Sequence, residues 1–581
     1  MEERTFDVLV VGASLGGVAA ALRASAMGAS VCLLEASEWI GGQYSSQGLT
    51  RGDETEYIAG GTGCTALYAQ FRANAVAYYT SSFALSATGK ALHPFQPGAV
   101  DARYATNLRV GPRVAHLVLA QMLRATAPAV TVLTGMRAHS VESNGSRVAA
   151  VIARPYDGAP VRFAASYVLD ATDLGEVLVL ADAPHAIGAE ARTEFGEPAA
   201  PDAAHPEWIQ PITLPVAVER RPAGENHTIP KPLGYDEIVR AKPFAMEFGA
   251  GGVFRATGGD SLFNYRQFVA AANFADPSLR YDVTTLNDVS NDYREEGFPT
   301  GDPARDQSVL LAARARSLAY VYWLQTACPR DDGTGNGYPN VRVATEVFGT
   351  PDGVAPLPYV RESRRIKARK TVRQQDIVVG DAPRATLFPD ACGIGWYRLD
   401  MHTLLNGMPD YEGRQPAHFQ IPLGALVPAD GTENLLPACK NLGVTHITNS
   451  AYRVHPIEWN IGEAAGALAA FCVKHAMTPS TVLEAPQLHV FQDALLAAGV
   501  PLYWWSDLPP ADAALFRAAH LLGARGYLTR PASLAFGAAD IVGPLEHAEI
   551  ERAVGGSSLP WPSTTMTRAD VAAWLVAHLQ L

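Results

Sequence analysis

The chain has 581 residues, which is too long for a single compact core, so two or three domains are expected. Hydrophobic residues make up 48% and charged residues 18% of the chain, a composition that is typical of globular proteins and argues against a disordered or fibrous one. The formal net charge of -12 would repel phosphate backbones, so nucleic acid is not an expected partner.

The first predicted elements form a βαβ unit. Residues 6–11 are a short apolar run, suited to a strand buried in a parallel sheet. A glycine-rich turn follows, then an alanine-rich helix over residues 18–27 and a second strand over residues 30–34, which ends in Glu35. Strand, glycine turn, helix, strand and acid in this order predict a dinucleotide-binding site.

The glycine turn carries the residue types that such a site needs. Gly12 permits the tight turn, and Gly17 lets the helix pack closely on the sheet. Ser14 stands where the backbone approaches the pyrophosphate, and its small side chain keeps that approach open although glycine is usual there. Glu35 can accept hydrogen bonds from ribose hydroxyls. The expected cofactor contacts of this unit are Gly12, Ser14, Leu15, Gly16, Gly17, Glu35 and Ala36.

The segment after the acid favours FAD over NAD. Gly41, Gly42 and Gln43 follow closely, and a Gly-Gly pair at this place is typical of FAD enzymes, in which the chain runs past the ribityl and pyrophosphate region. Residues 108–170 are expected to form a helix and then several strands that return to the FAD-binding sheet.

The middle of the chain reads as a substrate domain inserted into the FAD domain. Residues 190–375 contain many prolines, aromatic residues and predicted loops. A second glycine cluster, residues 249–252, has no buried strand before it and no regular helix after it, so a loop is expected there. Without a recognisable NAD(P)H-binding domain, direct oxidation of a substrate is favoured, with electrons passed to oxygen or another acceptor.

Residues 376–478 are expected to complete the FAD domain. Residues 434–438 are strand-like, and residues 459–466 open an alanine-rich helix that runs to about His475. Small residues such as Gly462 would let this helix lie tightly against the cofactor or the sheet. Its positive N-terminal end can stabilise the negative charge that develops on reduced flavin.

The tail from about residue 480 differs in character. Residues 516–528 and 571–579 are predicted helices, with Thr567 as an N-cap and Asp570 in the third helical position. The order of these features weakly resembles an S-layer-homology repeat, a module that often binds cell-wall polymers. The alternative is a small helical cap packed on the catalytic body, which the missing signal peptide favours.

Several stretches together resemble a known family. They are residues 11–17, 41–43, 169–176, 358–365 and 440–466. On these residues the chain resembles the FAD-dependent oxidoreductases of the glutathione-reductase-type flavoprotein superfamily, in the branch also described as xanthan-lyase-like. The sequence departs from that pattern at Ser14 and at Cys439-Lys440, where relatives commonly have glycine followed by Arg or Lys.

The resemblance implies a fold and further cofactor contacts. The fold is α/β, with a Rossmann-type FAD-binding domain at residues 1–189 and 376–478, an inserted α+β substrate domain at residues 190–375, and a small helical C-terminal domain at residues 479–581. The additional contacts to FAD implied in this way are Gly41, Gly42, Gln43, Ala171, Thr172, Asp173, Asn441, Asn460, Ile461 and Gly462. No residue signals a covalent flavin link.

The segment before the glycine-containing helix, which by resemblance runs alongside the isoalloxazine, supplies candidate catalytic residues. Flavin-dependent oxidation needs a base for a substrate proton. His455 is the first candidate because its ordinary pKa is near 6.5, although a lone histidine is more often structural. Tyr452 and Glu458 are further candidates, and Glu458 could instead hold backbone N–H groups at a helix start.

Two other candidates lie earlier in the chain. Arg361 belongs to an Arg-Glu-Ser-Arg-Arg run and offers a planar fork to a carboxylate substrate or the flavin phosphates. An internal Arg–Glu network is the equal alternative. His402, beside Asp400, is a weaker third candidate for the base.

Other classes of site are not expected. The six cysteines lack CxxC spacing, which argues against a redox dithiol and an iron–sulfur site, so they are expected to be buried small hydrophobes. No metal-ligand spacing and no GxSxG elbow occur, so neither a metal nor serine hydrolysis is predicted. No apolar run is long enough to span a membrane. The N-terminus leaves no room for an export signal, so a cytoplasmic location is expected, or the cell envelope if a signal was removed.

Together the patterns predict an FAD-dependent oxidase or dehydrogenase. It would oxidise a small or medium organic substrate by hydride transfer to flavin N5, with oxygen or another acceptor reoxidising the flavin. One alternative is a flavin monooxygenase or hydroxylase reduced by NAD(P)H, and another is a cell-envelope binding protein with structural FAD. The substrate, the electron acceptor, the oligomeric state and any cell-wall or homo-oligomer contact of the tail stay open.

Overall fold

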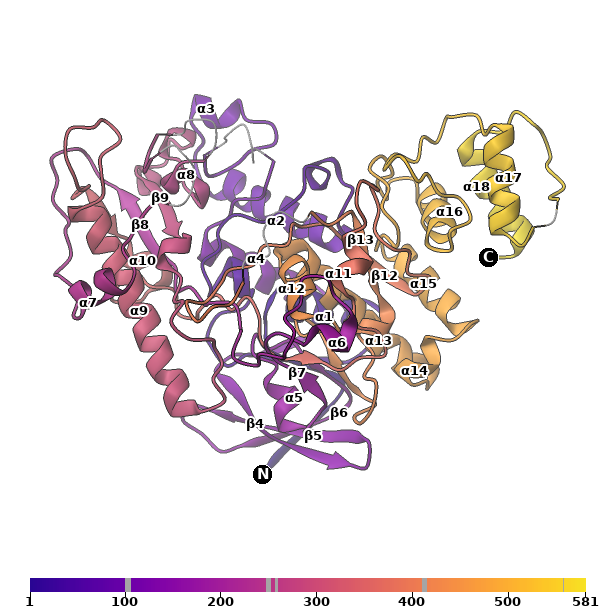
Figure 1. Ribbon diagram of the computed structural model, residues 1–581, viewed down its shortest axis with the longest axis horizontal. Helices are drawn as coiled ribbons and strands as arrows, with labels where there is room; N and C mark the ends of the chain where they lie inside the picture. Colours follow the sequence, from indigo (N-terminus) through magenta and orange to yellow (C-terminus); the bar gives the residue numbers. More distant parts are fainter. Residues whose placement is uncertain (100–105, 247–251, 256–259, 410–414, 557) are drawn as a thin grey trace.

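A seven-stranded sheet forms the base of the structure (Figure 1). The computed structural model describes residues 1–99, 106–246, 252–255, 260–409, 415–556 and 558–581. The strands of this sheet are β1 (Glu2–Val11), β2 (Val31–Leu34), β3 (Thr131–Leu133), β4 (Met136–Asn144), β5 (Arg147–Pro155), β6 (Val161–Asp170) and β14 (Leu435–Pro437).

The sheet has a parallel core and an antiparallel edge. Its order is β3-β2-β1-β6-β5-β4, and β14 also pairs with β6. The strands β3, β2, β1, β6 and β14 run parallel, whereas β6, β5 and β4 form an antiparallel meander. A mixed α/β fold with a parallel sheet confirms the predicted class and is consistent with a Rossmann-type FAD-binding fold.

Two helices cross in close contact beside the sheet, α1 (Leu15–Ala26) and α13 (His455–His475). A Cβ atom added to Gly462 would lie 1.9 Å from the carbonyl oxygen of Gly16, and one added to Gly466 would lie 2.2 Å from that of Ala20. The small residues of α13 therefore serve its packing on α1. The helix begins earlier than predicted, with Pro456 in its first turn, where a missing N–H costs nothing.

The middle of the chain builds a second hydrophobic core. A three-stranded antiparallel sheet of β10 (Val341–Val343), β8 (Val216–Arg220) and β9 (Asp282–Leu286) packs with the long helix α9 (Pro303–Thr326). Figure 1 shows this group at one end of the molecule. Short pairs elsewhere join β7 (His185–Ala186) with β11 (Arg365–Ile366), and β12 (Ala391–Gly395) with β13 (Phe419–Pro422).

Helices surround these sheets. Those that begin before residue 376 are α2 (Ala66–Ser82), α3 (Ala87–Lys90), α4 (Pro112–Arg124), α5 (Glu176–Leu180), α6 (Arg192–Phe195), α7 (Tyr235–Ala241), α8 (Leu262–Tyr265), α10 (Thr345–Phe348) and α11 (Gln374–Ile377). Those that follow are α12 (His446–Tyr452), α14 (Pro479–Val482), α15 (Gln487–Ala497), α16 (Ala513–Ala524), α17 (Pro544–Ala553) and α18 (Arg568–Leu579).

The C-terminal helices α16, α17 and α18 lie at the opposite end from α9 in Figure 1 and share a hydrophobic core of their own. Helix α18 begins with the predicted cap: Thr567 accepts the N–H of Asp570, whose carboxylate accepts the N–H of Thr567. The N-cap prediction is therefore confirmed.

Three predictions of the sequence analysis concern isolated features. All six cysteines are free and buried, as expected. Residues 249–251 of the second glycine cluster lie outside the described residues. Within the described ranges no helix is both long enough and apolar enough to cross a membrane.

Candidate functional site

A cavity of about 990 Å³ opens at the carboxyl ends of β1, β2 and β6. Ligands of open α/β sheets bind at this edge. At that edge it is lined by residues 11–14, 34–36 and 171–174, and we call it the cofactor cavity. Its other lining residues are Gly42, Ser46, Gly135, Met136, Arg137, Ala138, His139, Arg154, Pro155, Tyr156, Glu176, Val179, Leu180, Phe298, Pro299, Gly301, Pro303, Asp306, Gln307, Leu310, Leu357, Pro358, Val360 and Arg364.

The glycine turn has the geometry that the sequence predicted. Gly12 has a φ of 95°, and a Cβ there would lie 2.5 Å from the carbonyl oxygen of Ala171. Ser14 caps α1 by accepting the N–H of Gly17 at 3.2 Å. Its departure from glycine therefore adds a helix cap and keeps the turn intact.

Glu35 directly follows β2, and its carboxylate faces the turn. One oxygen accepts the N–H of Ala13 at 2.8 Å and the other accepts the N–H of Ser37 at 2.8 Å. Burial raises the pKa of Glu35, and these two N–H groups oppose that rise. The acid thus stands at the cavity edge and braces the turn.

Glu458 lies at the start of α1, where it accepts the N–H of Gly16 at 3.2 Å and the side-chain N–H of Gln43 at 2.5 Å. Lys440 contacts Asp173 and lies 3.6 Å from the Glu458 carboxylate. Burial acts to lower the pKa of Lys440, but these two carboxylates raise it above its ordinary value. Glu458 therefore holds a backbone N–H at a helix start, the second of its two predicted roles.

The predicted cofactor residues divide into two groups. Those that line the cofactor cavity are Gly12, Ser14, Glu35, Ala36, Gly42, Ala171, Thr172 and Asp173. Those that lie outside its lining, all within the described part of the chain, are Leu15, Gly16, Gly17, Gly41, Gln43, Asn441, Asn460, Ile461 and Gly462.

Members of the second group have structural partners nearby. Asn441 donates to the carbonyl oxygen of Asp170 at 3.0 Å and so joins the ends of β14 and β6. Asn460 accepts the N–H of Ile394 at 3.1 Å and thereby ties α13 to β12.

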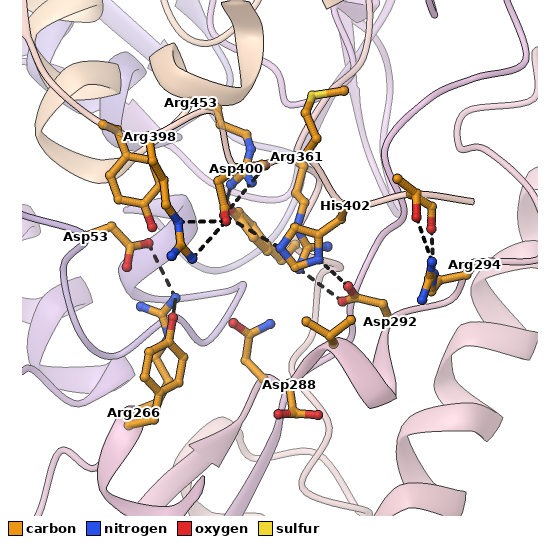
Figure 2. A pocket seen from close by; sticks show the side chains of 17 residues that line it. Asp53, Arg266, Asp288, Asp292, Arg294, Arg361, Arg398, Asp400, His402 and Arg453 are labelled. Carbon is orange, nitrogen blue, oxygen red and sulfur yellow. Dashed lines mark hydrogen bonds and ion pairs between the residues drawn. The ribbon is translucent and has the colours of Figure 1, made fainter. Parts of the chain in front are cut away.

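A second cavity, of about 260 Å³, is strongly polar (Figure 2). Its lining comes from widely separated segments of the chain. We call it the polar pocket; it is lined by Asp53, Tyr265, Arg266, Asn287, Asp288, Val289, Asp292, Arg294, Tyr359, Arg361, Tyr397, Arg398, Asp400, Met401, His402, Thr403 and Arg453.

The two cavities share one wall, the extended segment of residues 358–361. Pro358 and Val360 line the cofactor cavity, whereas Tyr359 and Arg361 line the polar pocket. Side chains of an extended segment alternate between its two faces, so one stretch of chain serves both cavities.

His402 stands between two carboxylates in the polar pocket (Figure 2). Its Nδ1 lies 2.5 Å from Asp292 Oδ2, and its Nε2 lies 3.6 Å from Asp400 Oδ2. Arg361 Nη2 donates to Asp292 Oδ1 at 3.0 Å, and Arg453 Nη2 donates to Asp400 Oδ2 at 3.0 Å. The two predicted residues Arg361 and His402 are therefore brought together.

Both of these aspartates are ionised at neutral pH. Burial alone would raise the pKa of Asp292, but Arg361 and the adjoining His402 ring lower it to about 2. Burial likewise opposes ionisation of Asp400, but the neighbouring His402 ring and the charges of Arg453 and Arg398 hold its pKa well below the ordinary value. The pocket is a dense array of fixed charges.

Asp53 and Arg266 form the opposite wall of the pocket in Figure 2 and lie 3.4 Å apart. His455 lies behind Asp53, fully buried, and its Nδ1 accepts the Asp53 N–H at 3.2 Å. Burial lowers the pKa of His455 to about 3, against the opposing charge of Asp53. Tyr452 is also fully buried and donates to the carbonyl oxygen of Gln420 at 2.8 Å.

The Arg-Glu-Ser-Arg-Arg run lies in two different environments. Arg361 faces the polar pocket. Glu362 instead joins a buried network, in which it pairs with Arg365 and lies 2.8 Å from His446 Nδ1. The predicted internal Arg–Glu network is therefore present at Glu362 and Arg365, whereas a substrate- or phosphate-binding role of Arg361 stays a prediction.

Residues 7–495 match the family model described as FAD dependent oxidoreductase. The chain belongs to this family. FAD is therefore its cofactor, and it is an oxidoreductase. No curated protein matches the sequence.

Similarities to solved structures are low. The chain resembles the myxobacterial chondrochloren halogenase CndH at 11% identity and a TM-score of 0.34, over 99% of this chain and 97% of that one. It resembles p-nitrophenol 4-monooxygenase PnpA from Pseudomonas putida DLL-E4 at 12% identity and a TM-score of 0.27, over 64% of this chain and 71% of that one. The likeness to L-proline dehydrogenase from P.horikoshii has 13% identity and a TM-score of 0.17. It covers 32% of this chain and only 24% of that one. Likenesses this low indicate no reaction.

The cofactor cavity suits FAD. Its volume is at the upper end of the range for ligand sites, roughly 300–1,000 Å³. The close approach of Gly12 to the end of β6 leaves no room for a side chain, as a pyrophosphate turn requires. Backbone at residues 12–14 and the Glu35 carboxylate would hold the dinucleotide.

Sequence reasoning missed most of the polar pocket. Asp53, Arg266 and Asp292 carry no local motif and meet only in the folded chain. The one available signal was the pairing of Asp400 with His402 two residues later. Such a spacing places both side chains on the same face of an extended segment.

Proposed function

We propose that the protein is an FAD-dependent oxidase or dehydrogenase that oxidises a small polar molecule bound in the polar pocket, with His402 as the proton acceptor. One observation carries the proposal: the buried Asp292 pairs with the half-buried His402 in a cavity that shares a wall with the cofactor cavity. Titratable groups in a cleft beside a cofactor site are where proton transfer is expected.

The roles follow from the contacts. When bound, FAD supplies a two-electron acceptor that takes a hydride equivalent from a substrate carbon. Asp292 binds Nδ1 of His402 and orients the ring, so Nε2 is the atom that accepts a proton from a substrate hydroxyl or amino group. Arg361 keeps Asp292 ionised, and Arg453 and Arg398 offset the charge of Asp400.

We also propose the division of the chain into an FAD-binding domain (residues 1–189 and 376–478), a substrate domain (190–375) and a helical C-terminal domain (479–581). The separate hydrophobic cores of the middle and C-terminal regions support it. The sheet order, with an antiparallel meander beside parallel strands, supports placement in the glutathione-reductase-type superfamily.

The first experiment is an absorbance spectrum of the purified protein, followed by anaerobic addition of NADPH and NADH. We expect a flavin spectrum that neither nucleotide bleaches and that a polar substrate from a screen of alcohols, amines and acids does bleach. Rapid bleaching by a nicotinamide nucleotide would move the function to a monooxygenase or reductase. The absence of flavin, even after reconstitution with FAD, would overturn the proposal.

Replacing the base gives a sharper test. For His402→Asn we expect anaerobic bleaching by the substrate to slow by about 10²- to 10⁴-fold, because general-base assistance is lost. The flavin content should stay unchanged, since His402 does not line the cofactor cavity. The matched control is His578→Asn, at an exposed position on α18. Equal bleaching rates in the two variants would remove His402 from the mechanism.

A further inference from the structure

The polar pocket carries a surplus of positive charge. Five arginines and four aspartates line it, so its formal charge is one positive when His402 is neutral. Arg266 pairs with Asp53, Arg361 with Asp292, and both Arg398 and Arg453 share Asp400. A largely buried surplus charge is unfavourable without a counter-charge, so the pocket is complementary to an anion.

Arg294 is positioned to bind an anion, because its side chain is bonded to neutral groups. Its Nε and Nη2 donate to the carbonyl oxygen and hydroxyl of Thr403 at 2.5 and 2.7 Å, which are neutral acceptors. Among the residues that the structure describes, Arg294 makes no ion pair with a carboxylate. The two bonds to Thr403 hold the guanidinium in one orientation at the pocket lining (Figure 2). A fixed and unneutralised guanidinium is suited to bind a planar anion.

Three further N–H groups of the pocket arginines lack acceptors. The Nε atoms of Arg266, Arg361 and Arg453 are buried and, within the described part of the chain, have no hydrogen-bond partner. These side chains are at least nine-tenths buried. Buried donors without acceptors are rare and costly, but these atoms expose almost no surface to the open pocket, so they add to its polar character without offering a contact to a ligand.

We propose that the substrate of the polar pocket carries a carboxylate and that Arg294 is its anchor. This inference rests on the proposed function, because it names the substrate class of the same pocket. The surplus of one charge matches a carboxylate monoanion better than a phosphate dianion. The volume of about 260 Å³ lies just below the range of roughly 300–1,000 Å³ for ligand sites, so the molecule is small, such as a hydroxy or amino acid.

The test uses three probes of nearly equal size and different charge: oxamide, which is neutral, oxamate, a monoanion, and oxalate, a dianion. Each is titrated into the FAD-loaded protein by calorimetry, and the shift of the flavin visible spectrum is a second readout that needs no turnover. We expect oxamate to bind at least about tenfold more tightly than oxamide, because a charge-assisted contact is gained. Inorganic phosphate should bind more weakly than oxamate.

The anchor is tested with Arg294→Gln and Arg294→Lys. We expect the first to weaken oxamate binding by about ten- to a hundredfold with oxamide binding unchanged, and the second to recover part of the loss by keeping the charge. The matched control is Arg305→Gln, at an exposed arginine paired with Glu296. Loss of oxamate binding in this control would show that the effect is not local to the pocket and would overturn the assignment of Arg294.

The outcomes separate the two proposals. Equal affinity for oxamide and oxamate in a protein whose flavin a substrate bleaches would overturn the carboxylate site alone. Tighter binding of phosphate than of oxamate would reassign the site to a phosphorylated ligand. Selective oxamate binding in a protein whose flavin no substrate bleaches would support the carboxylate site and contradict the oxidoreductase role of the pocket.

Discussion

The two cavities are built on different principles, although one segment of chain separates them. The cofactor cavity is shaped by backbone: a glycine turn, strand ends and small residues that leave no space for a side chain. The polar pocket is shaped by long charged side chains that reach in from distant segments and hold one another in place. The cofactor cavity depends on glycines that have no side chain at a few positions. The polar pocket depends on the balance between positive and negative side chains.

This difference decides how each cavity should fail. In the cofactor cavity a single added methyl group is expected to disrupt FAD binding, because it would clash with backbone that cannot move independently. In the polar pocket the shape survives an isosteric change, but the loss of one charge leaves its partner buried and unpaired.

The largest effect is expected from Gly12→Ala. A Cβ there meets backbone at 2.5 Å and also requires a φ of 95°, so strain of about 1–3 kcal/mol adds to overpacking of about 1–3 kcal/mol. We expect loss of bound flavin, measured by the visible absorbance of the purified protein, and a lower melting temperature. The matched control is Gly28→Ala, which has the same φ of 95° but meets nothing within 4 Å. Equal flavin content in both variants would contradict the role of the turn.

The next effect is expected from Asp292→Asn, which keeps the shape of the polar pocket and removes one charge. Arg361 would lose its buried partner, at a cost of about 3–5 kcal/mol in the free energy of unfolding. The matched control is Asp236→Asn, whose exposed partner is Lys231, with an expected cost of about 0–1 kcal/mol. Urea unfolding of the three proteins measures the difference, and similar losses in both variants would show that burial does not matter here.

The same contrast explains what could be predicted from the sequence. The FAD-binding half was accessible because its determinants are local: Gly12 and Glu35 are read from one continuous βαβ pattern, and the N-cap at Thr567 from four residues. The polar pocket was not accessible because Asp53, Arg266 and Asp292 have no pattern in the chain and gain their meaning from tertiary contacts.

For Gly462 the close packing was predicted correctly, but the segment that packs against it was not. Gly462 was expected to bring its helix close to the cofactor or the sheet, and the residue does mark a close approach. The neighbour is the backbone of Gly16 in α1. A glycine in a helix can indicate that another segment packs closely against it, but the sequence does not show which segment, because that depends on the topology.

The smallest effect is expected for His455, which lies behind the lining of the polar pocket. Its effect on the pH dependence of stability tests whether the charge network of the pocket extends beyond the lining. His455 has a folded-state pKa of about 3, lowered mainly by burial, against an ordinary value near 6.5. Below pH 6.5 the unfolded chain therefore binds a proton that the folded chain does not. Stability contributed by this group is complete above that pH and is lost as the pH falls towards 3, by about 1.4 kcal/mol per pH unit.

His455→Gln removes this proton uptake from the unfolded state. We expect the variant to be less stable at neutral pH because the packing against Tyr44 is disturbed, but its free energy of unfolding should fall less steeply than that of the parent between about pH 6.5 and pH 4.5. Urea titrations across that range measure the two slopes. Parallel slopes would mean that His455 takes up its proton in the folded state, beside the ionised Asp53, and that the charge network of the pocket extends through its wall.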